Sequence, residues 1–267
     1  MPGRPHYIGV GRSGNPRDPV SYRAMHVPHG PLTDYYAREA DRHGWVRRLF
    51  DRTAVDYDRV ERIMALGSGS WYRRRALARA GLGAGMRVVD VGVGTGLMAR
   101  EAARLVGSAG HVTGVDPSRG MMERAILPAA VELLLGRAES IPLAAESADF
   151  LSMGYALRHV SDLSLVFREF LRVLTPGGRL CVLEITPPPG RLGRAALKGY
   201  MRGVVPFVAR CIGRHRDAPM LMRYYWDTIE ACASPAVILA AMREAGFTDV
   251  RRVLTLGIFS EYCARKP

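Results

Sequence analysis

The stretch RVVDVGVGTGLMAREAARLVGSAGHVTGVD, residues 87–116, decides the fold. It opens with a Val-rich run at 87–91, which is typical of a buried parallel strand. A glycine-rich turn follows, and residues 97–106 then place apolar side chains at helical spacing. Residues 111–115 form a second apolar run that ends in Asp116. Strand, helix and strand in this order predict a βαβ unit.

The glycine turn predicts a cofactor site. Gly92, Gly94 and Gly96 carry no Cβ, so the backbone can turn tightly and approach a ligand. Their G-x-G-x-G spacing differs from the dinucleotide fingerprint G-x-G-x-x-G. Asp90 precedes them, and its carboxylate would repel a pyrophosphate but suits the ammonium and sulfonium of S-adenosylmethionine. We therefore expect S-adenosylmethionine at this turn rather than NAD.

A second acid supports a nucleoside ligand. Asp116 lies about twenty residues beyond Gly96, the spacing at which such folds hydrogen-bond the ribose hydroxyls. The alternative is an acidic strand end above a glycine turn that only packs a helix.

The rest of the chain continues the alternation of strands and helices. The expected elements are strands at 131–135, 148–155 and 179–186, a helix that starts at 162 and stops before Pro176, and a helix followed by two strands within 234–264. This order predicts an α/β fold with a doubly wound, mostly parallel sheet and helices on both faces. Ligands of such sheets bind at the carboxyl ends of the strands. Residues 153–159, at one such end, are therefore expected beside the cofactor.

The composition excludes several classes of protein. A chain of 267 residues that is 48% hydrophobic can bury one good-sized core. Its four Cys residues form no C-x-x-C pair, which argues for a reduced, cytoplasmic protein without a metal site or disulfide framework. No apolar stretch reaches the roughly 18 residues that a membrane span needs.

The charge and the N-terminus bound the partners. A net charge of +13 predicts attraction to anionic surfaces, although the chain carries no nucleic-acid-binding motif. Residues 1–35 begin with a Gly-, Pro- and Arg-rich segment without the apolar core of a secretion signal, and we expect a flexible tail there. Residues 36–267 are expected to form the folded domain.

Taken together, these segments resemble the ubiquinone/menaquinone biosynthesis C-methyltransferases, which are class I S-adenosylmethionine-dependent enzymes. The resemblance runs from about Val46 to about Ile258. Its motifs are LFDRTAVDYD (49–58), DVGVGTG (90–96), GYALRHVSD (154–162), RVLTPGGRLCVLE (172–184), RYYWDTI (223–229) and LTLGI (254–258). It implies a Rossmann-like methyltransferase domain with N-terminal helices and a helical lid, and methylation of a polyprenylated benzoquinol or naphthoquinol ring.

The resemblance also implies cofactor contacts. Thr95 and Asp116 match contacts in the glycine loop and at the ribose. Arg137 and Ala138 occupy the adenine side, where the family usually has Asn or Asp before Ala. Gly154 matches a small contact residue, often Ser, at the end of the fourth strand.

Two residues are the catalytic candidates. Arg158 matches an arginine that the family places at the substrate and implicates in proton removal, and its permanent charge could stabilise a phenolate. His159 stands where Asn is usual, and imidazole can accept a proton near neutral pH. The alternatives are a salt-bridging arginine and a structural histidine.

The acceptor is less constrained than the cofactor. Tyr57, Tyr155 and Tyr224 are expected to line an aromatic pocket, although such residues are often core. Glu61 and Gly69 depart from the family pattern on the substrate side. A phospholipid amine, a phenolic or polyketide acceptor, and a non-catalytic S-adenosylmethionine-binding subunit therefore stay open.

Residues 188–228 are expected to form the substrate lid. They are basic and apolar, which fits a membrane surface where polyprenyl quinone precursors reside. We expect a cytoplasmic protein with peripheral contact to the inner membrane. The alternative for residues 188–228 is a packed helical cover in water. For the assembly of the protein, a homodimer stays open.

Overall fold

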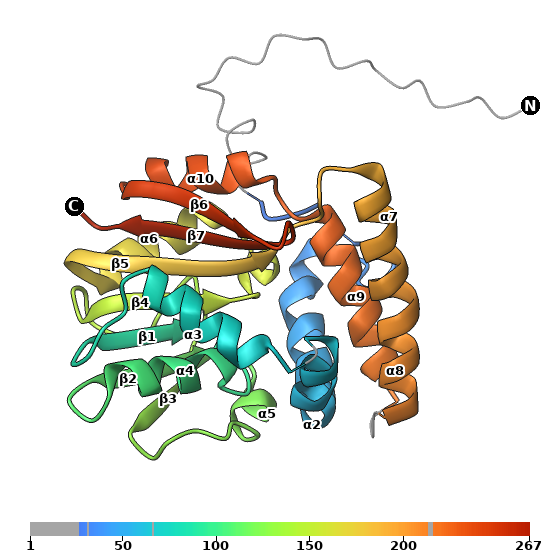
Figure 1. Cartoon of the computed structure of the whole chain (residues 1–267), viewed down its shortest axis with the longest axis horizontal. Helices are drawn as coiled ribbons and strands as arrows, with labels where there is room; N and C mark the ends of the chain where they lie inside the picture. Colours follow the sequence, from blue (N-terminus) through green and yellow to red (C-terminus); the bar gives the residue numbers. More distant parts are fainter. Residues whose placement is uncertain (1–26, 31, 66, 213–215) are drawn as a thin grey trace, which may run out of the picture.

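The computed structural model describes residues 27–30, 32–65, 67–212 and 216–267, and its centre is a seven-stranded sheet in the order β3-β2-β1-β4-β5-β7-β6 (Figure 1). The strands are β1 Arg87–Val91, β2 His111–Asp116, β3 Val131–Leu135, β4 Ala148–Gly154, β5 Leu174–Ile185, β6 Thr248–Thr255 and β7 Phe259–Arg265. Only β7 runs antiparallel to its neighbours β5 and β6. The predicted doubly wound, mostly parallel sheet is confirmed.

The register around β1 places the predicted cofactor residues at one edge. Asp90 in β1 lies beside Gly114 in β2 and Ser152 in β4. The chain order reverses between β1 and β4, which opens a crevice at their carboxyl ends. The loops after β1, β2 and β4 therefore meet in space, although they are tens of residues apart in the sequence.

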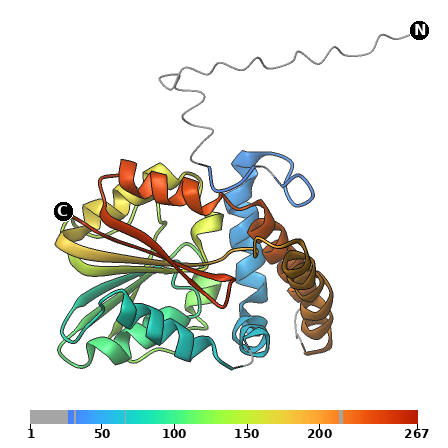
Figure 2. The same cartoon turned by 45° about the horizontal axis from the view of Figure 1, so that its top comes forward.

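Helices cover both faces of the sheet, as Figure 2 shows. They are α3 Gly69–Arg79 and α4 Leu97–Val106 on one face, and α6 Leu163–Val173 and α10 Pro235–Glu244 on the other. Val88 and Val89, adjacent in β1, face the two opposite cores, as the alternation along a strand requires. Asp162 caps α6 by accepting hydrogen bonds from the amides of Ser164 and Leu165.

A helical layer stands at the carboxyl ends of the parallel strands (Figure 1). It contains η1 Glu39–Asp41, α2 Arg42–Met64, α7 Arg191–Gly199, the π-helical turn η3 Tyr200–Val204, α8 Val205–Ile212 and α9 Ala218–Ala231. Short helices α5 Arg119–Met122 and η2 Leu157–His159 follow β2 and β4. Leu49, Val205 and Trp226 belong to the separate core of this layer. The predicted N-terminal helices and the predicted helical insert are both present.

Part of the predicted tail belongs to this layer. Residues 1–26 lie outside the described residues. Leu32 and Tyr35 pack against the helical core, and the Tyr35 hydroxyl donates to Asp227 at 2.5 Å. The chain is therefore packed some residues before position 36.

Candidate active site

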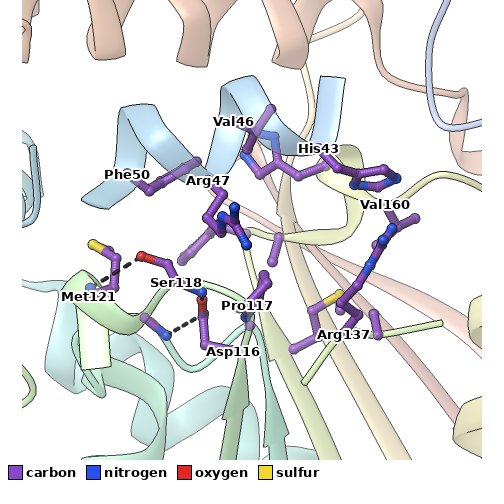
Figure 3. A pocket seen from close by; sticks show the side chains of 18 of the residues that line it. His43, Val46, Arg47, Phe50, Asp116, Pro117, Ser118, Met121, Arg137 and Val160 are labelled. Atoms are coloured by element: carbon purple, nitrogen blue, oxygen red, sulfur yellow. Dashed lines mark hydrogen bonds between the residues drawn. The ribbon is translucent and has the colours of Figure 1, made fainter. Parts of the chain in front are cut away.

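A cavity of about 310 Å³ lies between α2 and the carboxyl ends of the strands. Figure 3 shows side chains of α2 pointing towards the loops that follow β2 and β3. Nine of the residues predicted from the sequence line this cavity: Gly92, Gly94, Asp116, Arg137, Ala138, Gly154, Tyr57, Tyr155 and His159. The fold thus brings the predicted cofactor side and the predicted acceptor side into one space.

The glycine loop forms one wall because no side chain fits there. Gly92 and Gly94 have φ angles of +72° and +55°, a region that favours glycine. A Cβ on Gly92 would stand 2.7 Å from the Cβ of Ala156. A Cβ on Gly154 would meet nothing closer than 3.7 Å, so the serine common in the family would fit. The loop backbone is thus bare towards the cavity, as close approach of a cofactor requires.

Asp116 stands at the end of β2 and lines the cavity. Its carboxylate accepts hydrogen bonds from the amides of Gly94 at 2.8 Å and Ser118 at 2.7 Å. Burial raises the pKa of this carboxyl to about 6. The backbone thus orients the acid that the sequence predicted for the ribose hydroxyls.

Asp90, Thr95 and Gly96 do not line the cavity. The buried Asp90 carboxylate accepts a hydrogen bond from the Ser152 hydroxyl at 2.7 Å, and burial raises its pKa to about 7. The Thr95 hydroxyl donates to Asp58 of α2, and Gly96 precedes the first residue of α4. These three residues therefore lie outside the cavity lining, and Thr95 links the glycine loop to α2.

A further contact ties α2 to the loop after β2. The Asp51 carboxylate accepts hydrogen bonds from the Ser118 hydroxyl at 2.6 Å and from the amide of Gly120 at 3.0 Å. Together with the bond between Thr95 and Asp58, it fastens α2 over both cofactor loops.

Arg137 and Ala138, which the sequence predicted on the adenine side, line the cavity. The Arg137 Nε lies 3.5 Å from a carboxylate oxygen of Glu139, which also lines the cavity. Glu139 accepts hydrogen bonds from the amide and the hydroxyl of Ser161, both at 2.8 Å. A carboxylate is therefore present on this side, although position 137 itself carries a cation.

The other end of the cavity is aromatic. Phe50 and Tyr57 of α2 face Tyr225 of α9, with ring centroids 6.2 Å and 6.4 Å from it. Tyr57 and Tyr155 lie where the sequence predicted them. Tyr224 does not line the cavity, because its buried ring packs edge-on against Trp45 at 5.0 Å. Its neighbour Tyr225 takes the place predicted for it.

His159 lines the cavity beside these rings. Its imidazole stacks on Tyr224 at 5.5 Å, and Nδ1 lies 3.3 Å from the Tyr224 hydroxyl. Nε2 has no hydrogen-bond partner in the described part of the chain. Burial, with the positive charges of Arg158 and Arg42, holds the pKa of His159 well below 6.5. The ring is therefore neutral at pH 7.

Arg158 does not line the cavity and lies behind its aromatic wall. Its Nη1 is 2.8 Å from the Glu184 carboxylate, and both side chains are buried. Nε donates to the Thr228 hydroxyl at 3.2 Å, and Nη1 donates to the Tyr155 carbonyl at 2.6 Å. The guanidinium lies 4.6 Å from the centroid of the Tyr225 ring. This arginine is therefore separated from the cavity by Tyr225.

Several lining residues were not predicted. Those on α2 are His43, Gly44, Val46, Arg47 and Phe50, and those after β2 are Pro117, Ser118 and Met121 (Figure 3). The α2 residues recur at helical spacing towards Tyr57, so a helical projection of residues 43–57 could have identified them.

The comparisons with known proteins agree with this geometry. A model of the ubiE/COQ5 methyltransferase family matches residues 37–266. A relative from Syntrophotalea carbinolica, named ubiquinone/menaquinone biosynthesis C-methyltransferase UbiE, is 36% identical over 81% of this chain and 92% of its own. A demethylmenaquinone methyltransferase from Mycobacterium sp. (strain KMS) is 33% identical over 83% of this chain and 94% of its own.

Solved structures share the fold. An S-adenosylmethionine-dependent methyltransferase from Thermotoga maritima superposes with a TM-score of 0.59 at 24% identity, over 82% of this chain and 99% of that one. One from Aquifex aeolicus gives 0.58 at 19% identity, over 79% and 98%. The fold, the glycine loop with its two acids, and the match over most of the chain show that this protein belongs to the ubiE/COQ5 methyltransferase family, whose cofactor is S-adenosylmethionine.

Proposed function

We propose that the protein methylates a ring carbon of a polyprenylated benzoquinol or naphthoquinol. One observation carries this proposal: a single continuous cavity joins the glycine loop and Asp116 to an aromatic end that contains His159. The printed names of the relatives, a ubiquinone/menaquinone C-methyltransferase and a demethylmenaquinone methyltransferase, support the same acceptor class.

The residues of the cavity would mainly align two reactants. When bound, S-adenosylmethionine supplies a methyl group activated by its sulfonium. Asp116 would accept hydrogen bonds from the ribose hydroxyls. The backbone at Gly92 and Gly94, which carries no side chain, would leave space for the rest of the nucleoside. Phe50, Tyr57 and Tyr225, which line the aromatic end of the cavity, would contact the acceptor ring. Fixing both partners in one orientation removes much of the entropic barrier to a displacement reaction.

His159 would accept a proton from the acceptor. A quinol carbon becomes nucleophilic when a ring hydroxyl ionises, and the ring must finally lose a hydrogen from the methylated carbon. His159 lines the cavity, and its Nε2 is buried without a hydrogen-bond partner among the described residues. The lowered pKa keeps the imidazole neutral at pH 7, which a general base requires before proton transfer. His159 would take either proton directly or through water.

Arg158 would be a positioning residue. Its buried pair with Glu184 and its contact with the Tyr225 ring, together with its absence from the cavity lining, support this role. The pair fixes η2, and with it the orientation of His159, the next residue in the chain.

Product analysis tests the reaction. Purified protein would be mixed with a demethylated naphthoquinol and ¹³C-methyl S-adenosylmethionine, and the product examined by NMR. A ring C–CH₃ signal is expected. A methoxy or N-methyl signal, or transfer only to a phospholipid amine or a polyketide phenol, would refute carbon methylation of quinols. Cofactor binding without transfer to any acceptor would indicate a non-catalytic subunit.

We propose further that the outer face of α7 and α8 contacts the inner membrane. Leu192 of α7 and Phe207 of α8 are 88% and 67% exposed. The same helical stretch carries the half-exposed basic side chains Arg194, Lys198 and Arg202, which pair with Glu230 and Asp227 of α9. No helix among the described residues is long and apolar enough to cross a bilayer. An amphipathic helix of this kind can lie in the headgroup region.

Vesicle sedimentation tests the membrane proposal. Vesicles with anionic lipid should retain the wild type and lose the variant Leu192→Glu/Phe207→Glu. The matched control is Leu165→Glu, an exposed apolar position on α6, which should bind like the wild type. Equal binding of all three proteins would refute this face as the contact.

A further inference from the structure

Two tyrosine hydroxyls meet at the aromatic end of the cavity. Tyr57 comes from α2 and Tyr225 from α9, and their oxygens are 2.7 Å apart. Both residues line the cavity. Within the described chain, neither hydroxyl makes another hydrogen bond. The fold therefore builds a hydroxyl pair from two segments that are 168 residues apart.

The pair holds one more proton than its own hydrogen bond uses. Burial raises the pKa of Tyr57 and of Tyr225, so both phenols stay protonated at neutral pH. One O–H donates to the other oxygen, and the second O–H is left to donate to a third group. Because both side chains line the cavity, that third group would be a ligand atom that accepts hydrogen bonds.

A buried cation lies against one member of the pair. The Arg158 guanidinium is 4.6 Å from the Tyr225 ring centroid and is held there by Glu184 and Thr228. A positive charge at a ring face attracts the electrons of the ring and so stabilises negative charge that develops on the phenol. The Tyr225 O–H is thereby made a stronger donor towards an anionic oxygen.

The proposed proton acceptor, His159, lies close to the tyrosine pair. The His159 ring is 6.2 Å from the Tyr225 ring, at an interplanar angle of 74°, and 5.5 Å from Phe50. A ring oxygen held near this wall could lose its proton to His159 and keep a hydrogen bond from the tyrosine pair. The donor and the proton acceptor thus border the same part of the cavity.

We propose that Tyr57 and Tyr225 act as one hydrogen-bonding unit that binds the acceptor's ring oxygen and stabilises it as an oxyanion, with Arg158 acting through Tyr225. This inference rests on the proposed quinol methylation and names the group that recognises the oxygen. The pair donates a hydrogen bond without giving up its proton. The hydroxyl proton of the acceptor goes to His159, and no bond of either tyrosine is broken.

The first test does not require turnover. A naphthol whose ionised form absorbs in the visible range would be titrated while bound to the full-length protein loaded with S-adenosylhomocysteine. The wild type should raise the ionisation constant of the bound naphthol about tenfold or more over Tyr225→Phe, because hydrogen bonds to charged groups are strong. Tyr72→Phe, which removes a buried hydroxyl outside the cavity, is the matched control and should behave as the wild type.

The second test uses the methyl transfer. Tyr57→Phe and Tyr225→Phe should each lower kcat about a hundredfold to a thousandfold, as loss of one oxyanion donor does, with unchanged affinity for S-adenosylmethionine. The double variant should lose little more than the worse single variant, since the two hydroxyls act as a unit.

The two tests separate this inference from the proposed function. If the wild type does not bind the naphthol, or binds it with the same ionisation constant as Tyr225→Phe, the inference is overturned even where quinols are methylated. If no quinol is methylated but the naphthol shift depends on both tyrosines, the hydroxyl pair stands and the acceptor is a different phenol.

Discussion

The Arg158 guanidinium lies 2.8 Å from the Glu184 carboxylate, and both side chains are buried outside the active-site cavity. The arginine at the tip of β4 is thus held by an acid on the neighbouring strand β5. Removing either partner would leave an uncompensated charge in the protein interior.

Glu184→Gln should therefore lower the free energy of unfolding by about 3–5 kcal/mol, the usual cost of breaking a buried pair. For a domain of this size the loss corresponds to a fall in Tm of about 10 °C, measurable by calorimetry. Asp149→Asn, which breaks the partly exposed pair with Arg87, is the control and should cost about 1 kcal/mol or less. Equal falls in Tm for the two variants would show that the buried pair stabilises the fold no more than the exposed pair does.

His159→Ala should lower kcat by about 10²–10⁴-fold, the range typical of a lost general base. Affinity for S-adenosylmethionine, measured by calorimetry, should stay within about twofold because His159 stands at the aromatic end. Tyr224→Phe removes only the hydroxyl beside Nδ1 and should have a smaller effect on kcat. Parallel loss of turnover and cofactor affinity would argue for a structural histidine.

The pH profile should reflect the lowered pKa of His159. Burial and the charges of Arg158, Arg42 and His29 lower the pKa of His159, so the imidazole stays neutral at pH values below 6.5. As pH falls, kcat should decline only well below pH 6.5, because the base is lost only when it becomes protonated. NMR titration of the His159 ring would assign the group. A half-point at an unshifted pKa would contradict the assignment.

Cofactor affinity should weaken in acid because of Asp116. Its pKa is raised to about 6, so its carboxyl is protonated below that pH and can no longer accept hydrogen bonds from both ribose hydroxyls. The dissociation constant of S-adenosylmethionine should rise as pH falls from 7 to 5. Asp116→Asn should bind at least about tenfold more weakly at pH 7 and lack this dependence. A variant with the wild-type dependence would place the titrating group elsewhere.

Asp90 should make stability depend on pH. Its folded pKa is raised to about 7 from 3.8, so the stability it contributes is present below pH 3.8 and is lost as pH rises through 7. At pH 8 the folded wild type carries a buried charge that Asp90→Asn lacks. The variant's Tm relative to the wild type should therefore be several degrees higher at pH 8 than at pH 5. Asp149→Asn, whose wild-type carboxyl has a lowered pKa, should show no such change.

The elements that short-range sequence patterns determine could be predicted from the sequence. Residues 87–116 specify strand, turn and helix through short-range periodicity and glycine, so these elements were predictable. Which side chains of the loop face the cavity was not, because Asp90, Thr95 and Gly96 do not line it. The choice between Tyr224 and Tyr225 was not, because one helical step rotates a side chain by about 100° and the contacts of α9 come from distant α2. The burial of Arg158 likewise depends on Glu184 in another strand, which only tertiary structure brings near.

The proposed carbon methylation of a quinol is tested most directly in a bacterium that lacks its quinone C-methyltransferase. Cells expressing this chain would be extracted, and their quinones analysed by mass spectrometry. We predict that methylated quinone reappears in the wild type and is strongly reduced with His159→Ala. If only the demethylated precursor persists, while the purified protein still binds S-adenosylmethionine, the acceptor is not a quinol and the central claim is wrong.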